Sequence, residues 1–159
     1  MPGQPMKISS FHTIHTVGYE GETIDNFITK LKENKIRILV DIRELPLSRK
    51  KGFSKSQLSN HLENNKIEYF NIRELGSPRD VRHFYYESGD FEAFRIEYLN
   101  YIRNQETKIS ELLLLVKNYS NKGNVGVMCF EKDHEKCHRS VLLDYIQKKF
   151  SPDIKICHI

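Results

Sequence analysis

The chain has 159 residues, of which 38% are hydrophobic and 29% are charged, and its formal net charge is +4 at pH 7. This composition excludes a disordered chain, and the length predicts one domain over residues 11–159 behind a flexible segment at 1–10. We find no charged-then-apolar leader and no apolar run near the roughly 20 residues of a membrane helix, so we expect a cytoplasmic protein without membrane contact.

The first half of the chain alternates strand and helix signals. β-Branched and aromatic residues predict a strand at 12–17, and Thr23 is a suitable N-cap for an amphipathic helix that follows it. An almost continuous apolar run at 36–42 predicts a strand covered on both faces, as in a parallel sheet. After a basic loop, Ser54 and Gln57 form a candidate capping box for a helix at about 55–65.

The second half repeats this alternation. We expect a strand at 67–72, two helices with apolar faces at 91–102 and 109–116, and a buried strand that ends near Glu131. A last helix reaches about residue 149, and a short strand closes the chain. Alternating strands and helices predict an α/β fold with a mainly parallel sheet of about five strands and helices on both faces. Residues 73–90 lack periodicity and are predicted to form an irregular lid.

Several sequence pieces resemble the family of domain of unknown function DUF488, over roughly residues 13–150. The pieces are Thr16-Val-Gly-Tyr-Glu20, Val40-Asp-Ile-Arg-Glu-Leu-Pro46 with Ser48-Arg49, Tyr69-Phe-Asn-Ile-Arg-Glu-Leu-Gly76, and Cys129-Phe-Glu131 with Cys137-His-Arg-Ser140. The combination is specific, although any one piece alone is weak. The resemblance implies a single Rossmann-like α/β domain and little about activity, because the family's function is not established. The residues that match its motifs are Asp41, Arg43, Arg49, Glu131, Cys137, His138 and Arg139.

Cys137 stands directly before the last predicted helix. A thiol at a helix N-terminus beside cationic groups has a lowered pKa, which makes Cys137 a candidate nucleophile. Adjacent helical residues diverge, so its base stays open among His138, Glu131 and His134. The alternative is structural: Cys137 packs inward, and Arg139 pairs with a carboxylate.

Carboxylates and arginines are expected to meet at one end of the sheet. Asp41 and Arg43 alternate at the end of the second strand and point to the same face, while Glu131 ends the fourth strand. If these strands are neighbours, Arg139 joins them. The carboxylates can then perform acid–base chemistry while the arginines bind an anion. A salt-bridge network that ties the strand ends together explains the same residues equally well.

The loop at 43–55 is the most basic stretch of the chain. Its cations can follow phosphates while aromatic side chains stack on bases, although a solvated surface loop is the more common reading of such a stretch. Further stacking surfaces are offered by Tyr19, Tyr69, Phe84, Tyr85 and Tyr86. We assign substrate or phosphate binding to Tyr19, Arg43, Ser48, Arg49 and Arg139.

Two familiar sites are disfavoured by spacing. A phosphate loop of the cysteine phosphatase or rhodanese type needs an arginine at the sixth position after its cysteine, where this chain has Glu135 or Leu143. The loop at 18–21 breaks the Gly-x-Gly-x-x-Gly spacing at Glu20, so NAD binding has little support. We predict no cofactor.

The cysteines are Cys129, Cys137 and Cys157. An odd, small number argues against a disulfide framework and predicts reduced thiols. Cys129 and Cys137 lie within ten residues of each other together with His134 and His138, and such ligands can bind zinc. Paired ligands usually leave about two to four residues between them. Seven separate the two cysteines, so we predict no metal site.

These observations favour a small enzyme whose anion-binding site acts on a nucleotide or nucleic-acid substrate. Its catalytic candidates are Asp41, Glu131, Cys137 and His138. The alternatives are a non-catalytic nucleic-acid-binding module led by the basic loop, and a thiol- or metal-dependent enzyme acting on a small molecule. The sequence does not indicate an oligomeric state.

Overall fold

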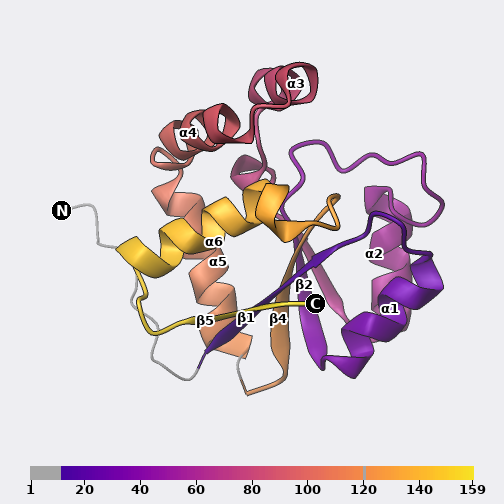
Figure 1. Ribbon diagram of the computed structural model, residues 1–159. Coiled ribbons are helices and arrows are strands. Elements are labelled where there is room, and N and C mark those ends of the chain that lie inside the picture. The colour runs from indigo at the N-terminus through magenta and orange to yellow at the C-terminus, as the bar shows by residue number, and fades with distance from the viewer. Residues whose placement is uncertain (1–11, 120) are drawn as a thin grey trace.

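The computed structural model describes residues 12–119 and 121–159, so the predicted flexible segment at 1–10 lies outside the described residues (Figure 1). Five parallel strands form one sheet. They are β1 (Thr13–Gly18), β2 (Ile36–Asp41), β3 (Glu68–Asn71), β4 (Asn124–Cys129) and β5 (Lys155–His158). The helices are α1 (Ile24–Glu33), α2 (Lys55–Asn64), α3 (Arg79–Ser88), α4 (Phe91–Ile102), α5 (Glu106–Tyr119) and α6 (His138–Lys149), with short 3₁₀ turns η1 (Arg73–Leu75) and η2 (His134–Lys136). None of the described helices is long and apolar enough to cross a membrane.

The strand order is β3-β2-β4-β1-β5, and it creates a switch point between β2 and β4. Helices α1 and α2 pack on one face of the sheet, whereas α4, α5 and α6 pack on the other (Figure 1). The chain therefore leaves β2 toward one face and leaves the neighbouring β4 toward the opposite face. Ligands of open α/β sheets bind in the crevice that such a divergence opens at the carboxyl ends of the strands. The predicted fold class is confirmed.

Local signals explain where the early helices begin. The Thr23 hydroxyl accepts from the Asn26 amide at 3.2 Å, so the predicted N-cap of α1 is confirmed. Ser54 precedes α2, but the predicted capping box is wrong. Its hydroxyl donates to the Ser48 carbonyl at 3.0 Å, and Gln57 accepts from the Gly52 amide at 3.0 Å. Both side chains therefore tie the helix to the preceding loop and not to its own first turn.

The prediction of irregular structure over residues 73–90 is wrong. The segment contains η1 and the ten-residue helix α3, which stands beside α4 at the top of the view in Figure 1. Its apolar residues Val81, Phe84 and Tyr85 fall at helical spacing, a signal that the prediction overlooked, although none of them is fully buried. Its aromatic residue Tyr85 contacts the rings of Phe91 and Phe94, which attaches α3 to α4.

Candidate active site at the ends of β2 and β4

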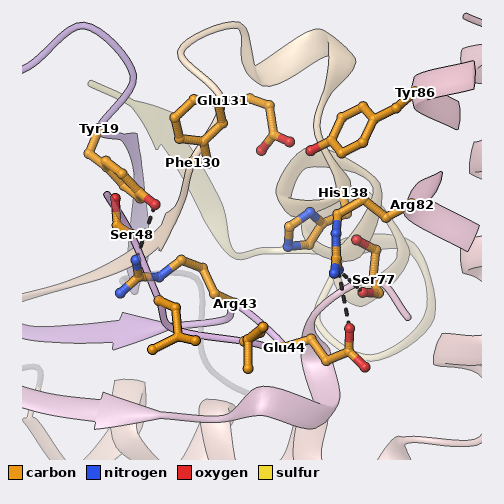
Figure 2. A pocket seen from close by; sticks show the side chains of 12 residues that line it. Tyr19, Arg43, Glu44, Ser48, Ser77, Arg82, Tyr86, Phe130, Glu131 and His138 are labelled. Carbon is orange, nitrogen blue, oxygen red and sulfur yellow. Dashed lines mark hydrogen bonds and ion pairs between the residues drawn. The ribbon is translucent and has the colours of Figure 1, made fainter. Parts of the chain in front are cut away.

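A cavity of about 350 Å³ lies at the switch point of the sheet (Figure 2). Its walls come from the loops that follow β1, β2 and β4, from the start of α6, and from α3. The lining residues are Tyr19, Arg43, Glu44, Leu45, Leu47, Ser48, Ser77, Arg82, Tyr86, Phe130, Glu131 and His138. The predicted site residues Tyr19, Arg43, Ser48, Glu131 and His138 therefore share one cavity.

One wall is built on a buried ion pair between Asp41 and Arg43. Arg43 Nη2 lies 2.7 Å from Asp41 Oδ2, and Arg43 Nε donates to both carboxylate oxygens at 2.9 and 3.1 Å. The Tyr69 hydroxyl also donates to Asp41, at 2.6 Å. Burial alone would lower the pKa of Arg43, but the hydrogen bonds and charge of Asp41 raise it above its ordinary value. Asp41 is fully buried and does not line the cavity, so its geometry is that of a structural partner.

Arg43 also fixes the aromatic side of this wall. Its Nη1 donates to the Tyr19 hydroxyl at 3.1 Å and to the Phe53 carbonyl at 2.7 Å. The Tyr19 ring stacks on Phe53 with centroids 4.6 Å apart and meets Phe130 edge-on at 5.3 Å. The guanidinium is therefore held in one orientation before any ligand arrives.

Arg82 forms the opposite wall from α3. Its Nη1 donates to the Ser77 carbonyl at 2.6 Å and to Glu44 Oε2 at 3.2 Å. Among the described residues, each side-chain hydrogen bond of Arg82 uses Nη1, which leaves Nε and Nη2 for a ligand. Sequence reasoning missed Arg82, and its signal would have been the four-residue spacing to Tyr86, which places both on one face of a helix.

Glu131 and Tyr86 face each other across the top of the cavity (Figure 2). Partial burial of the Tyr86 hydroxyl and the neighbouring Glu131 carboxylate raise the pKa of Tyr86 to about 12. A second hollow of about 410 Å³ adjoins this cavity, and the two share Tyr86, Phe130 and Glu131 in their linings. Phe130 and Tyr86 are exposed at the junction.

His138 occupies the middle of the cavity wall, in the first turn of α6 (Figure 2). The side chain is only 7% exposed, and its Nε2 has no hydrogen-bond partner within the described part of the chain. Buried polar atoms are nearly always paired, so this nitrogen requires an explanation. Burial lowers the pKa of His138, with the Glu131 carboxylate and the backbone carbonyl of Ile42 opposing that effect, so the imidazole is neutral at pH 7.

Cys137 sits beneath the cavity and not in its lining. Its Sγ caps α6 by accepting from the Arg139 amide at 3.4 Å and lies 3.3 Å from Glu131 Oε2. The expected lowering of its pKa is wrong, because burial and the neighbouring Cys129 and Glu131 raise the pKa of the Cys137 thiol well above its ordinary value. A protonated, 1%-exposed thiol is a weak nucleophile.

Arg139 and Arg49 lie away from the cavity lining. Arg139 is 1% exposed, and it donates to the Glu131 carbonyl, to the Lys132 carbonyl at 3.3 Å and to Cys129 Sγ at 3.0 Å. It therefore shapes the loop after β4 from beneath. Arg49 is exposed on the loop after β2, next to Ser48, which does reach the cavity.

Comparison with known proteins identifies a family for this chain. The model of the family described as domain of unknown function DUF488 matches residues 23–146. The chain belongs to the DUF488 family. That match includes both strand ends that build the cavity of this DUF488 domain. The curated proteins and the solved structures contain no match to the chain.

Proposed function

We propose that this DUF488 protein is a small enzyme that hydrolyses a phosphoester bond, either of a free nucleotide or of the terminal nucleotide of a nucleic-acid strand. The observation that carries the proposal is the unpaired Nε2 of His138, buried in a polar cavity between two arginines and opposite Glu131. Such a nitrogen is suited to bind a water or substrate atom and to move its proton.

The cavity walls favour a phosphate at one side. Arg43, held in place by Asp41 and Phe53, contributes positive charge to the wall, and Arg82 keeps one edge of its guanidinium for hydrogen bonds to a ligand. Charge-assisted bonds to a phosphate from a planar, preoriented guanidinium are among the stronger polar contacts in proteins. The lining also carries Glu44 and Glu131, whose charges offset those of the two arginines. Selectivity for a phosphate must therefore come from the geometry of the guanidinium groups and not from net positive charge.

The junction between the two hollows favours a base. Phe130 is 42% exposed and Tyr86 is 60% exposed, so both rings are available to a planar partner. Stacking on such rings contributes roughly 1–3 kcal/mol for each base. Adjoining volumes of about 350 and 410 Å³ fit a phosphate in the first hollow and a base at its border with the second.

His138 and Glu131 supply the acid–base chemistry in this mechanism. Glu131 orients a water, and neutral His138 takes one of its protons at Nε2 as the water oxygen bonds to phosphorus. The ester bond from phosphorus to the leaving oxygen then breaks, and His138 returns the proton to that oxygen. General acid–base catalysis by one positioned group typically contributes 10²- to 10⁴-fold, so about that loss is expected for His138→Gln.

Calorimetric titration with 5′-mononucleotides tests the binding site. Arg82→Gln should weaken binding about tenfold or more, since one charge-assisted pair is worth at least about 1.4 kcal/mol. Arg79→Gln is the matched control, because Arg79 is exposed on the same helix and outside the cavity. Equal weakening by both variants, or no binding by the natural protein, would contradict the proposal.

Product formation tests the chemistry separately. Chromatography of nucleotide and short oligonucleotide reactions should show release of phosphate or of a terminal nucleotide by the natural protein. His138→Gln should abolish that release while calorimetric binding persists. Turnover that survives in His138→Gln would remove the assigned base.

The alternative of a non-catalytic nucleic-acid-binding module rests on a different surface. Arg49 and Lys51 are exposed on the loop whose Ser48 lines the cavity. That alternative predicts binding of longer strands with a steep salt dependence, and a double Arg49→Gln, Lys51→Gln variant should reduce the slope by roughly 1.4–1.8. Salt-steep binding without any turnover would favour the module.

A further inference from the structure

Metal-ligating side chains converge just beneath the cavity floor. The ligand atoms of Cys129, Glu131 and Cys137 all lie within 4.8 Å of one another. Cys129 ends β4, Glu131 lies two residues further on, and Cys137 caps α6, so the divergence of the chain after β4 brings them together. Ligand atoms of a tetrahedral zinc ion lie roughly 3.3–3.8 Å apart, given bonds of about 2.0–2.3 Å. The 3.3 Å between Cys137 Sγ and Glu131 Oε2 already meets that requirement.

The charge of Arg139 is compatible with an ion at this place. Arg139 is 1% exposed, and its hydrogen-bond partners among the described residues are carbonyls, the Thr16 hydroxyl and the Cys129 thiol, with no carboxylate. A divalent ion that displaces the protons of both thiols and binds the carboxylate leaves the cluster with a net charge of −1, the same as the carboxylate alone. The ion therefore adds no positive charge beside Arg139, whose Nη1 lies 3.0 Å from Cys129 Sγ.

We propose that Cys129, Glu131 and Cys137 bind a zinc-class divalent ion. Paired thiolates select such ions over Mg²⁺ and Ca²⁺, which prefer oxygen ligands. Three protein ligands leave a fourth position for water, as in catalytic zinc sites. Glu131 belongs both to the cluster and to the cavity lining, so that position opens toward the cavity.

This inference rests on the proposed function and specifies the source of its nucleophile. A zinc-bound water loses its proton near neutral pH, so the bond-forming oxygen would be available without a strong base. His138 stands beside the cluster, with Nδ1 3.9 Å from Cys137 Sγ and Nε2 unpaired. It is the group placed to accept that proton and return it to the leaving oxygen.

Spectroscopy with Co²⁺ tests the site without relying on turnover. The full chain, reduced and freed of metal by a chelator, should bind one equivalent of Co²⁺. It should then show near-ultraviolet thiolate-to-cobalt absorption and the intense visible bands of four-coordinate cobalt. Competition against a chromophoric chelator should give one equivalent of Zn²⁺ at the same site. Binding should release about two protons, because both thiols must ionise.

Variants assign the ligands. Cys129→Ser and Cys137→Ser should each remove about half of the thiolate absorption, and Glu131→Gln should weaken Zn²⁺ binding at least tenfold. Cys157→Ser is the matched control, because Cys157 is an exposed thiol outside the cluster. Glu131 is only partly buried, so its variant keeps the test valid if a serine variant fails to fold.

Each outcome has a definite meaning. Absence of stoichiometric binding, cobalt spectra without thiolate absorption, or loss of the signal in Cys157→Ser would overturn the metal site. Calorimetry of mononucleotide binding by the metal-free protein separates the two proposals. Nucleotide binding with no metal binding overturns the metal site alone, whereas metal binding without nucleotide binding overturns the nucleotide proposal and leaves the ion in place.

Discussion

The ends of β2 and β4 lie side by side in the sheet, yet they are built in opposite ways. After β2, the Asp41 carboxylate receives bonds from Arg43 and Tyr69, and the charges are paired. After β4, the buried groups lack such partners within the described part of the chain. There, His138 has a nitrogen without a hydrogen-bond partner, and Arg139 has no carboxylate among its partners.

This contrast separates support from chemistry. A fully paired polar network rigidifies its surroundings and offers little to a ligand. Unpaired buried groups cost stability, so their presence points to a ligand, a water or an ion that completes them. The β2 end therefore acts as the fixed wall that orients Arg43, and the β4 end holds the reacting groups.

The largest effect is expected at the fixed wall. Asp41→Asn keeps the shape of the side chain but leaves the buried Arg43 charge without its partner, which typically costs about 3–5 kcal/mol. Denaturant unfolding followed by circular dichroism measures the loss. Arg43 is 6% exposed and cannot turn to solvent without opening the loop after β2.

An exposed ion pair gives the control for that experiment. Glu92→Gln removes the partner of Arg95 on the surface of α4, where solvent replaces the lost interaction, so stability should not change measurably. If Asp41→Asn is no worse than Glu92→Gln, the β2 end is not a structural wall and the comparison between the strand ends fails.

A close backbone approach couples the end of β1 to the loop after β4. A Cβ at Gly18 would stand 1.8 Å from the Glu131 carbonyl and 2.8 Å from Arg139 Nη1, so Gly18→Ala must displace the loop after β4. Overpacking of this kind costs roughly 1–3 kcal/mol, and mononucleotide binding should weaken with it because Glu131 moves. Thermal unfolding and calorimetric titration measure the two effects.

Gly126→Ala distinguishes overpacking from loss of a glycine in a strand. Its Cβ would meet side chains at 3.4 Å or more, which is ordinary contact. We expect Gly126→Ala to fold and bind as the natural protein does. Equal damage from the two substitutions would remove the special role of the contact between Gly18 and the loop after β4.

The sequence predicted the scaffold of this site because the signals were local. Three features depend only on neighbours along the chain, and all three are confirmed. They are the apolar run of β2, the polar pair Asp41 and Arg43 at its end, and the Thr23 cap of α1. The meeting of Asp41 with Arg43 needed only the alternation of side chains at one strand end. The neighbouring position of β2 and β4, which the prediction left conditional, is also present.

The remaining parts depend on tertiary contacts. The spacing in α3 places Arg82 and Tyr86 on one helical face, but it does not indicate which part of the fold that face meets, so their place in the cavity wall could not be predicted. The helix terminus at Cys137 was correctly located, but burial outweighs the helix dipole and raises the thiol pKa. Whether a group is buried is a property of its packing, and its pKa therefore follows from the fold.

The smallest effect concerns the reacting side of the comparison. Burial lowers the pKa of His138 in the folded protein, whereas the unfolded chain titrates near 6.5. The unfolded state therefore binds more protons below about pH 6.5, and the free energy of unfolding should fall as the pH drops from 7 to 5. His138→Gln should reduce that slope by at most about 1.4 kcal/mol per pH unit, the value for one proton.

His83→Gln, on the exposed side of α3, should keep the natural slope in urea unfolding between pH 5 and 8. His15 and His158 also have lowered pKa values in the folded protein, mainly through burial, so some acid sensitivity should persist in the variant. An unchanged slope in His138→Gln would mean that the imidazole already finds a proton partner at the β4 end, and the division between a satisfied wall and an unsatisfied reacting side would fail there.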